Sequence, residues 1–171
     1  MDGKERRRQL MALLREADVP LTGAVMAHRL GVSRQVIVGD MAILRAAGIE
    51  IYATPQGYIL PVAKESAAVV AKIACRHERD GMADELAVII DHGGKILDVI
   101  VEHGVYGEIK ANLMLSNRRD LAAFLDSLEK SRSKLLSAIT GGVHLHTIEA
   151  PNEEVLNNIR EDLGARGILL G

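Results

Sequence analysis

Two histidines separated by one residue are the clearest candidates for chemistry in this chain of 171 residues. His144 and His146 lie in a run at 143–148 whose pattern predicts a β-strand. Residues i and i+2 of a strand point to the same face, so both imidazoles should face one side of a sheet and Leu145 the other. Two neutral imidazoles on one face are a ready pair of ligands for a transition-metal ion.

Two further residues could complete a metal site with this pair. His77 follows a β-branched run that predicts a buried strand over 67–75, and Glu85 lies near the start of a helix predicted over 82–91. The turn between them could fold Glu85 back onto His77. We therefore predict that His77, Glu85, His144 and His146 bind one divalent ion in an open shell. Imidazole-rich shells suit nickel, zinc, iron or copper.

The same histidines allow a plainer interpretation. On spacing alone, a His-x-His pair also fits an edge strand that binds nothing, because a two-residue motif carries little information. His28, His92 and His103 are interpreted as core or surface residues, since the first belongs to the N-terminal part and the others flank loops. Cys75 is the only cysteine, which excludes a disulfide or a cysteine-rich zinc site within one chain.

The elements that must position these histidines alternate between strands and helices. Predicted strands cover 67–75, 96–101, 108–113 and 143–148. Predicted helices cover 82–91, 117–129 and 131–138, and Asn152 opens a last one. This order predicts an α+β domain over residues 62–171, without an internal repeat.

A second set of candidate residues lies near the N-terminus and points to DNA. Gly31 can end one helix in the left-handed conformation, and Ser33 can cap the next. Arg34 and Gln35 then fall in the first turn of that second helix. First-turn residues enter the major groove in a helix-turn-helix, where Arg suits a guanine edge and Gln an adenine edge. An ordinary helical hairpin could carry the same Gly-x-Ser pattern, so the neighbouring elements must distinguish a hairpin from a helix-turn-helix.

Those neighbouring elements favour the DNA-binding interpretation. Helices are predicted over 4–17 and 22–30, with Pro20 starting the second of them. After Gly48, alternating strands at 49–53 and 58–60 flank a turn with Pro and Gly. Three helices and a hairpin predict a winged helix-turn-helix domain over residues 1–61.

Charge is divided unevenly between the two parts. The chain carries a formal net charge of −2, yet residues 1–60 hold eight Lys and Arg against six Asp and Glu. Arg6 and Arg7 could reach a phosphate backbone, although a run of arginines at a helix end is equally consistent with simple solvation. The predicted DNA-binding residues are therefore Ser33, Arg34, Gln35, Val38, Gly39, Arg6 and Arg7.

Composition limits the classes of protein to which this chain can belong. Hydrophobic residues make up 48% of the chain and support a real core, while aromatic residues make up only 2%, which argues against base stacking. No apolar run reaches the roughly 18–20 residues of a membrane-spanning helix, and the charged start is unlike a signal peptide. We expect a cytoplasmic protein. The connection at 61–65 is short, so the two domains should be held close together.

The sequence as a whole resembles the bacterial niacin-responsive repressors of NAD biosynthesis and niacin uptake. The runs at 31–35, 45–48 and 53–58 look like the biotin-repressor-type winged helix-turn-helix. His77, His144 and His146 match the three histidines of the C-terminal 3H domain in that family. Gly39 departs from the pattern, where a polar or basic residue is common, and weakens the helix by up to about 1 kcal/mol relative to Ala.

The resemblance implies a transcriptional repressor, not an enzyme, with nicotinic acid as the corepressor. A carboxylate and a pyridine nitrogen could each complete an open metal shell. One winged helix-turn-helix reads a half-site, so we expect a homodimer on a pseudo-palindromic double-stranded operator. Two alternatives stay open: a repressor that senses the metal itself, and a metal-dependent enzyme fused to a DNA-binding module, since such an open site can activate water. Against the enzyme, the sequence carries no Walker, dinucleotide or Gly-x-Ser-x-Gly motif.

Overall fold

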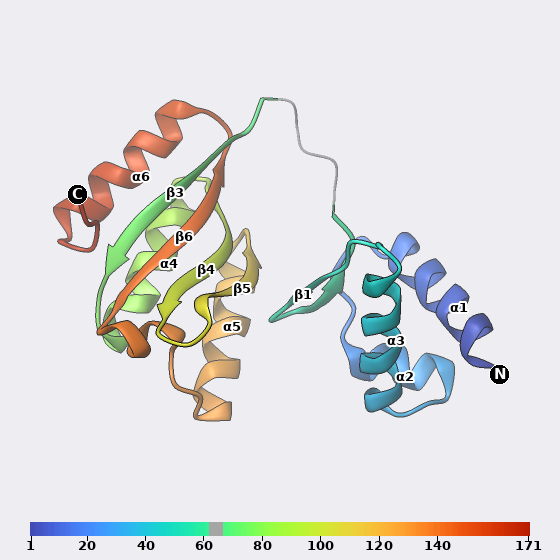
Figure 1. Cartoon of the computed structure of the whole chain (residues 1–171). Helices are drawn as coiled ribbons and strands as arrows, with labels where there is room; N and C mark the ends of the chain where they lie inside the picture. Colours follow the sequence, from blue (N-terminus) through green and yellow to red (C-terminus); the bar gives the residue numbers. More distant parts are fainter. Residues whose placement is uncertain (62–66) are drawn as a thin grey trace. The chain divides into compact units, whose positions relative to one another are not determined.

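The structure is a computed structural model that describes residues 1–61 and 67–171 (Figure 1). The chain divides into two compact units, Met1–Ala63 and Lys64–Gly171, which are described separately below. Most of the connection expected at 61–65 lies outside the described residues. In the part of the chain that the structure describes, no helix combines the length and apolar character needed to cross a membrane.

The N-terminal unit contains the predicted helices and hairpin. Its elements are α1 (Gly3–Glu16), α2 (Gly23–Leu30), α3 (Arg34–Ala46), β1 (Tyr52–Thr54) and β2 (Gly57–Ile59). The helices start where side chains can cap them: Asp2, Thr22 and Ser33 accept hydrogen bonds from backbone amides three residues on. Gly31 has φ of +64° and ends α2 in the left-handed conformation. A fully buried core of Leu10, Met26, Ile37 and Met41 joins the helices.

Two local predictions in this unit are wrong. Pro20 does not start α2, because Leu21 forms a backbone bridge with Tyr58 and the cap is Thr22. The strand predicted from residue 49 begins only at Tyr52. The preceding carbonyl of Ile51 is taken by the side chain of Arg45 at 2.9 Å, which ties it to α3 and not to the hairpin.

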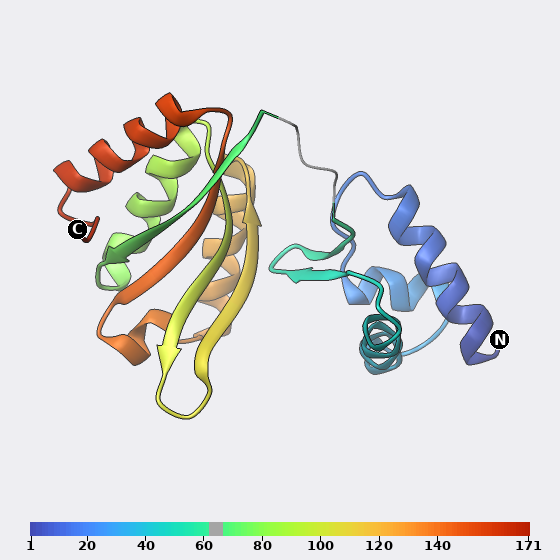
Figure 2. The ribbon, with the colours of Figure 1, turned by 45° about the horizontal axis from the view of Figure 1, so that its top comes forward.

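The C-terminal unit is an α+β fold with one antiparallel sheet. Within residues 67–171, its strands are β3 (Val69–Arg76), β4 (Lys95–His103), β5 (Gly107–Leu115) and β6 (Val143–Ala150), in the order β3-β6-β4-β5. The helices α4 (Met82–Asp91), α5 (Arg118–Ser131) and α6 (Glu153–Ala165) cover one face of this sheet (Figures 1 and 2). Alternate strand residues such as Ile73, Ile96 and Ile148 pack against the helices and form the core.

The sheet order bears directly on the His-x-His pair. Strand β6 lies between β3 and β4 and is paired with both, so the pair does not lie on an edge strand. The helix predicted over 131–138 is also wrong. Helix α5 runs to Ser131 and Arg132 turns at φ of +52°, after which a 3₁₀ turn, η2 (Leu136–Thr140), follows. The Ser131 hydroxyl accepts from the amide of Ser133 and so replaces a helical backbone bond.

Candidate metal and effector site

The predicted pair of histidines lies on the helix-facing side of the sheet. His144 and His146 are each 3% exposed, and their neighbours on the same face, Ile148 and Ala150, belong to the core. The β3–β6 register sets Cys75 opposite His144 and Ile73 opposite His146. Both imidazoles therefore lie between the central strand and the helices, and not on the open face of the sheet.

Glu85 is the residue on which the histidines converge. It belongs to the first turn of α4, which faces the sheet, and it is fully buried. Its Oε1 lies 2.9 Å from Nε2 of His144. Its Oε2 lies 2.5 Å from Nε2 of His77 and 3.4 Å from Nε2 of His146. The structure thus brings together all four residues that the sequence analysis singled out for this site.

The opposite ring nitrogen of each histidine is also occupied. Each Nδ1 lies within hydrogen-bond distance of a backbone carbonyl oxygen, which can only accept. The acceptors are Glu78 for His77 at 2.6 Å, Gly142 for His144 at 2.8 Å and Asp98 for His146 at 2.7 Å. Each Nδ1 therefore carries the hydrogen, and a neutral ring then directs the lone pair of Nε2 towards Glu85.

This tautomer arrangement suits a cation. If every Nε2 also carried a hydrogen, three imidazolium ions would surround one buried carboxylate and leave two charges uncompensated, which is costly. A metal ion between the Nε2 atoms and Glu85 removes that cost. Metal-ligating histidines commonly donate their second N–H to a backbone carbonyl, which fixes the ring in the ligating orientation. The residues present therefore fit a divalent ion.

The electrostatics of Glu85 agree with this role. In the absence of an ion, an Nε2 that carries a hydrogen donates it to Glu85: burial alone would raise the pKa of Glu85, but hydrogen bonds donated by His144, His146 and His77 outweigh burial and lower it well below its usual range. Burial likewise would lower the pKa of His77, and its hydrogen bond with Glu85 outweighs burial and raises it. The carboxylate is therefore ionised and available as an anionic ligand.

Backbone features hold the histidines in place. Gly142 has φ of +92°, and a Cβ at this position would lie 2.4 Å from the carbonyl oxygen of His77. Only glycine lets the chain pass this close and still offer its own carbonyl to His144. On β4, the register shifts around Asp98, whose carbonyl accepts from His146 while its Oδ1 accepts from the amide of Thr147 at 2.9 Å.

The sequence analysis missed Cys75 as a member of this cluster. Its sulfur, a Glu85 oxygen and a His144 nitrogen lie within 4.8 Å of one another, and all three residues are buried. Burial raises the pKa of the Cys75 thiol, and the charge of Glu85 raises it further. A usable signal existed: Cys75 lies two positions before His77, which is the spacing that puts two strand residues on one face.

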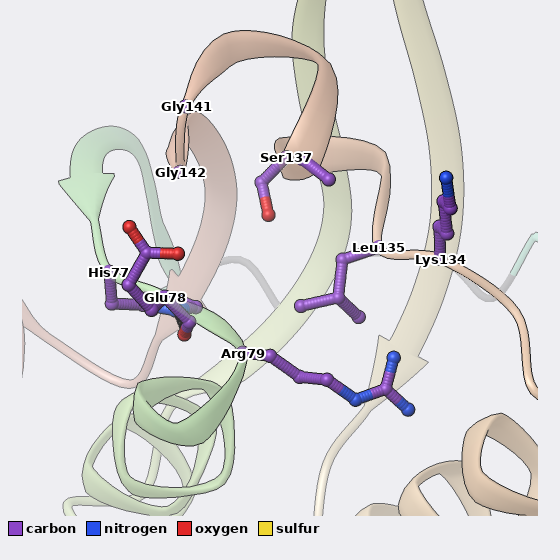
Figure 3. A pocket seen from close by; sticks show the side chains of 9 residues that line it. His77, Glu78, Arg79, Lys134, Leu135, Ser137, Gly141 and Gly142 are labelled. Atoms are coloured by element: carbon purple, nitrogen blue, oxygen red, sulfur yellow. Dashed lines mark hydrogen bonds between the residues drawn. The ribbon is translucent and has the colours of Figure 1, made fainter.

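A pocket of about 260 Å³ opens beside His77 (Figure 3). Its wall carries two cationic side chains, Arg79 and Lys134, and one carboxylate, Glu78. The hydroxyl of Ser137 points into it. Arg79 is held by a hydrogen bond of 3.0 Å from Nη1 to the carbonyl of Ser133. The pocket therefore offers a net positive, partly polar space next to one histidine of the cluster.

The predicted DNA-binding residues separate into two groups. On α3, Arg34, Gln35 and Gly39 are exposed and Val38 is half-buried, while the Ser33 hydroxyl accepts from the amide of Val36. These five residues share the first two turns of the helix and its cap. A major-groove contact by this surface stays a prediction.

Arg6 and Arg7 form the second group, and their side chains are engaged within the domain. Both pair with Asp40 of α3, which is 2% exposed and which the sequence analysis did not single out. Burial would raise the pKa of Asp40, but the hydrogen bonds from Arg6 and Arg7 outweigh it and lower the pKa. The two arginines tie α1 to α3, and a contact with phosphate stays a prediction.

Known proteins resemble the chain along nearly its whole length. Residues 6–59 match an HTH domain family and residues 70–171 match the 3H domain family. The probable transcription repressor NiaR of Thermotoga maritima is 41% identical over 167 residues, which cover 98% of this chain and 94% of the relative. The transcription repressor NadR of Bacillus subtilis is 38% identical over 170 residues, with 98% and 94% covered.

Proposed function

The chain belongs to the family of niacin-responsive transcription repressors that join an HTH domain to a 3H domain, and we propose that its 3H domain senses nicotinic acid through a bound divalent metal ion. As a member it is a DNA-binding regulator and not an enzyme. The interpretation as a metal-dependent enzyme is therefore set aside. The metal-sensing repressor remains as the alternative.

One observation carries the proposal of a metal. The Nε2 atoms of His77, His144 and His146 converge on one buried carboxylate while every Nδ1 is already bonded to a backbone carbonyl. These residues, with Glu85, would hold the ion. When bound, the ion supplies a Lewis-acid position to which a carboxylate or a pyridine nitrogen can coordinate.

The pocket beside His77 supports an anionic effector. Arg79 and Lys134 place two positive charges on its wall against the single negative charge of Glu78. A guanidinium is well suited to pair with a carboxylate, and Ser137 adds a neutral hydrogen-bonding group. Nicotinic acid carries the carboxylate that this wall would recognise, whereas nicotinamide does not.

The proposed output is tighter binding to operator DNA by a homodimer. A single winged helix-turn-helix reads one half-site, and paired half-sites supply the affinity. Nicotinic acid can shift this equilibrium only by binding more tightly to the DNA-competent state. We expect a coupling of about 5–150-fold in operator affinity, the range typical of allosteric effectors.

The test is an operator-binding titration of the full chain at fixed salt, without effector, with nicotinic acid and with nicotinamide. Only nicotinic acid should tighten binding. A double variant, His144→Ala with His146→Ala, should lose both the effect and the stoichiometric metal, and should keep the weak effector-free binding. His92→Ala is the matched control and should keep the metal and the response, because His92 bonds with Asp162 away from the cluster.

Three results would contradict the proposal. Equal operator affinity in all three conditions would reject the corepressor model. Control of DNA binding by metal alone would favour the metal-sensing repressor. If the double variant kept its full complement of metal, the ion would bind at residues other than the proposed ones.

A further inference from the structure

Cys75 belongs to the geometry of the proposed metal site. It is fully buried, lies opposite His144 in the β3–β6 register, and precedes His77, the residue that follows β3, by two positions. Cross-strand neighbours on one face have Cβ atoms about 4.5–5.5 Å apart, so the thiol and the imidazole share one space. Glu85 reaches the same space from α4, and the three possible ligand atoms lie within 4.8 Å of one another.

These separations suit a shared ion. A zinc–sulfur bond of about 2.3 Å and a zinc–nitrogen bond of about 2.1 Å put two ligand atoms roughly 3.6 Å apart in a tetrahedral site, and at most roughly 4.4 Å apart on opposite sides of an ion. The candidate ligand atoms lie within 4.8 Å of one another, so binding an ion would draw them together by up to about 1 Å.

We propose that Cys75 is a thiolate ligand of the metal ion, so that the site has nitrogen, oxygen and sulfur donors. This inference rests on the metal site of the proposed function. On binding, the S–H bond breaks, a sulfur–metal bond forms, and the proton passes to solvent. No electron is transferred, and the ion stays divalent.

The donor set narrows the class of metal. Thiolate and imidazole ligands together favour zinc, cobalt or nickel over magnesium and manganese, which prefer oxygen ligands. The charges also balance, since one thiolate and one carboxylate neutralise a divalent ion in a site where Glu85 and Cys75 are both fully buried. The carboxylate of an anionic effector is then left to the cations Arg79 and Lys134 of the adjoining pocket.

Cobalt provides the test, because a thiolate bound to Co²⁺ gives an intense near-ultraviolet charge-transfer band. The full chain is stripped with a chelator, loaded with Co²⁺, and its near-ultraviolet and visible absorption are recorded. Cys75 is the only cysteine in the sequence, so any such band arises from it. The wild-type chain should show this band together with the weaker visible bands of the metal.

Variants distinguish the absorption that depends on the thiol from the absorption that depends on the other proposed ligands. Cys75→Ser should lose the near-ultraviolet band and keep the visible bands, because the histidines and Glu85 still bind the ion. Cys75→Ala repeats the test without a buried hydroxyl. The His144→Ala, His146→Ala double variant should lose both sets of bands, and His92→Ala should keep both.

Two outcomes would overturn the inference, and they are distinguishable. Visible bands without a charge-transfer band in the wild-type chain would leave the metal site in place. They would show that the thiol is only a neighbour that packs in the core with Ile73 and Leu86. Failure of the wild-type chain to bind Co²⁺ at all would reject the metal site itself, and the proposed function with it.

Discussion

Replacing Asp40 by alanine should destabilise the N-terminal unit strongly, although the residue lies in the helix proposed to read DNA. Its carboxylate joins α3 to α1 through three hydrogen bonds. Arg6 donates from Nε to Oδ2 at 2.5 Å and from Nη2 to Oδ1 at 3.2 Å, and Arg7 donates from Nη1 to Oδ1 at 3.2 Å. These are the charge-assisted contacts between the two helices that the variant would remove.

The magnitude follows from how buried each partner is. Breaking a fully buried ion pair costs about 3–5 kcal/mol, because the remaining charge is left without a partner or water. Here Asp40 is 2% exposed, but the Arg6 and Arg7 side chains are 17% and 26% exposed and can turn to water. The loss should therefore fall below that range, at about 2–3 kcal/mol of unfolding free energy. Asp18→Ala, a change at an exposed carboxylate of the same unit, should cost within about 0.5 kcal/mol.

Native-state hydrogen exchange of the full chain measures this loss of unfolding free energy separately for each of the two units. Amides in α1 and α3 should lose about 2–3 kcal/mol of protection in Asp40→Ala, and amides in β4 and β6 should keep theirs. The pKa of Asp40 is lowered in the folded state, so its contribution is present above the usual carboxyl pKa and is lost as the pH falls through the folded value. Wild type and Asp40→Asn should therefore converge in stability in acid. Equal protection in Asp40→Ala and Asp18→Ala would refute the reasoning.

Three further predictions concern DNA and the histidine cluster. Arg34→Ala should cost about 1–3 kcal/mol at one base position of the operator, and an unchanged footprint would reject α3 as the recognition helix. Arg7→Ala should weaken binding to all sequences alike and flatten its salt dependence, and an unchanged salt slope in a filter-binding titration would exclude a phosphate contact. Gly142→Ala should weaken metal binding by equilibrium dialysis, since its Cβ would collide with the His77 carbonyl, whereas Gly164→Ala has open space and no left-handed backbone and should bind as wild type.

Local patterns in the sequence predicted much of this fold, because caps and periodicity act over a few residues. Ser33, Thr22, Asn117 and Asn152 each cap the helix that follows them, as their residue types indicate. The i, i+2 spacing was also sufficient to place His144 and His146 on one face.

Long-range pairing could not be predicted in the same way. No local pattern around Asp40 predicts that Arg6, 34 positions earlier, pairs with its carboxylate. The central place of β6 depends on which strands pair, and strand pairing is decided by packing across the whole sheet. The thiol of Cys75 joins the cluster only because that pairing sets it opposite His144. The helix predicted over 131–138 does not form, because the Ser131 hydroxyl competes for the amide of Ser133 that a helix would bond to a backbone carbonyl.

The backbone around the proposed metal ligands is paired more extensively at His144 and His146 than at His77, and this difference has a kinetic consequence. His144 and His146 belong to a strand paired on both sides, so separating them requires opening the centre of the sheet. His77, in contrast, follows the last residue of β3, and Gly141 and Gly142 precede β6 beside the pocket. Opening this end breaks few backbone bonds. The residence time of a bound ion or effector is then governed by the His77 end, and metal exchange should proceed much faster than global unfolding.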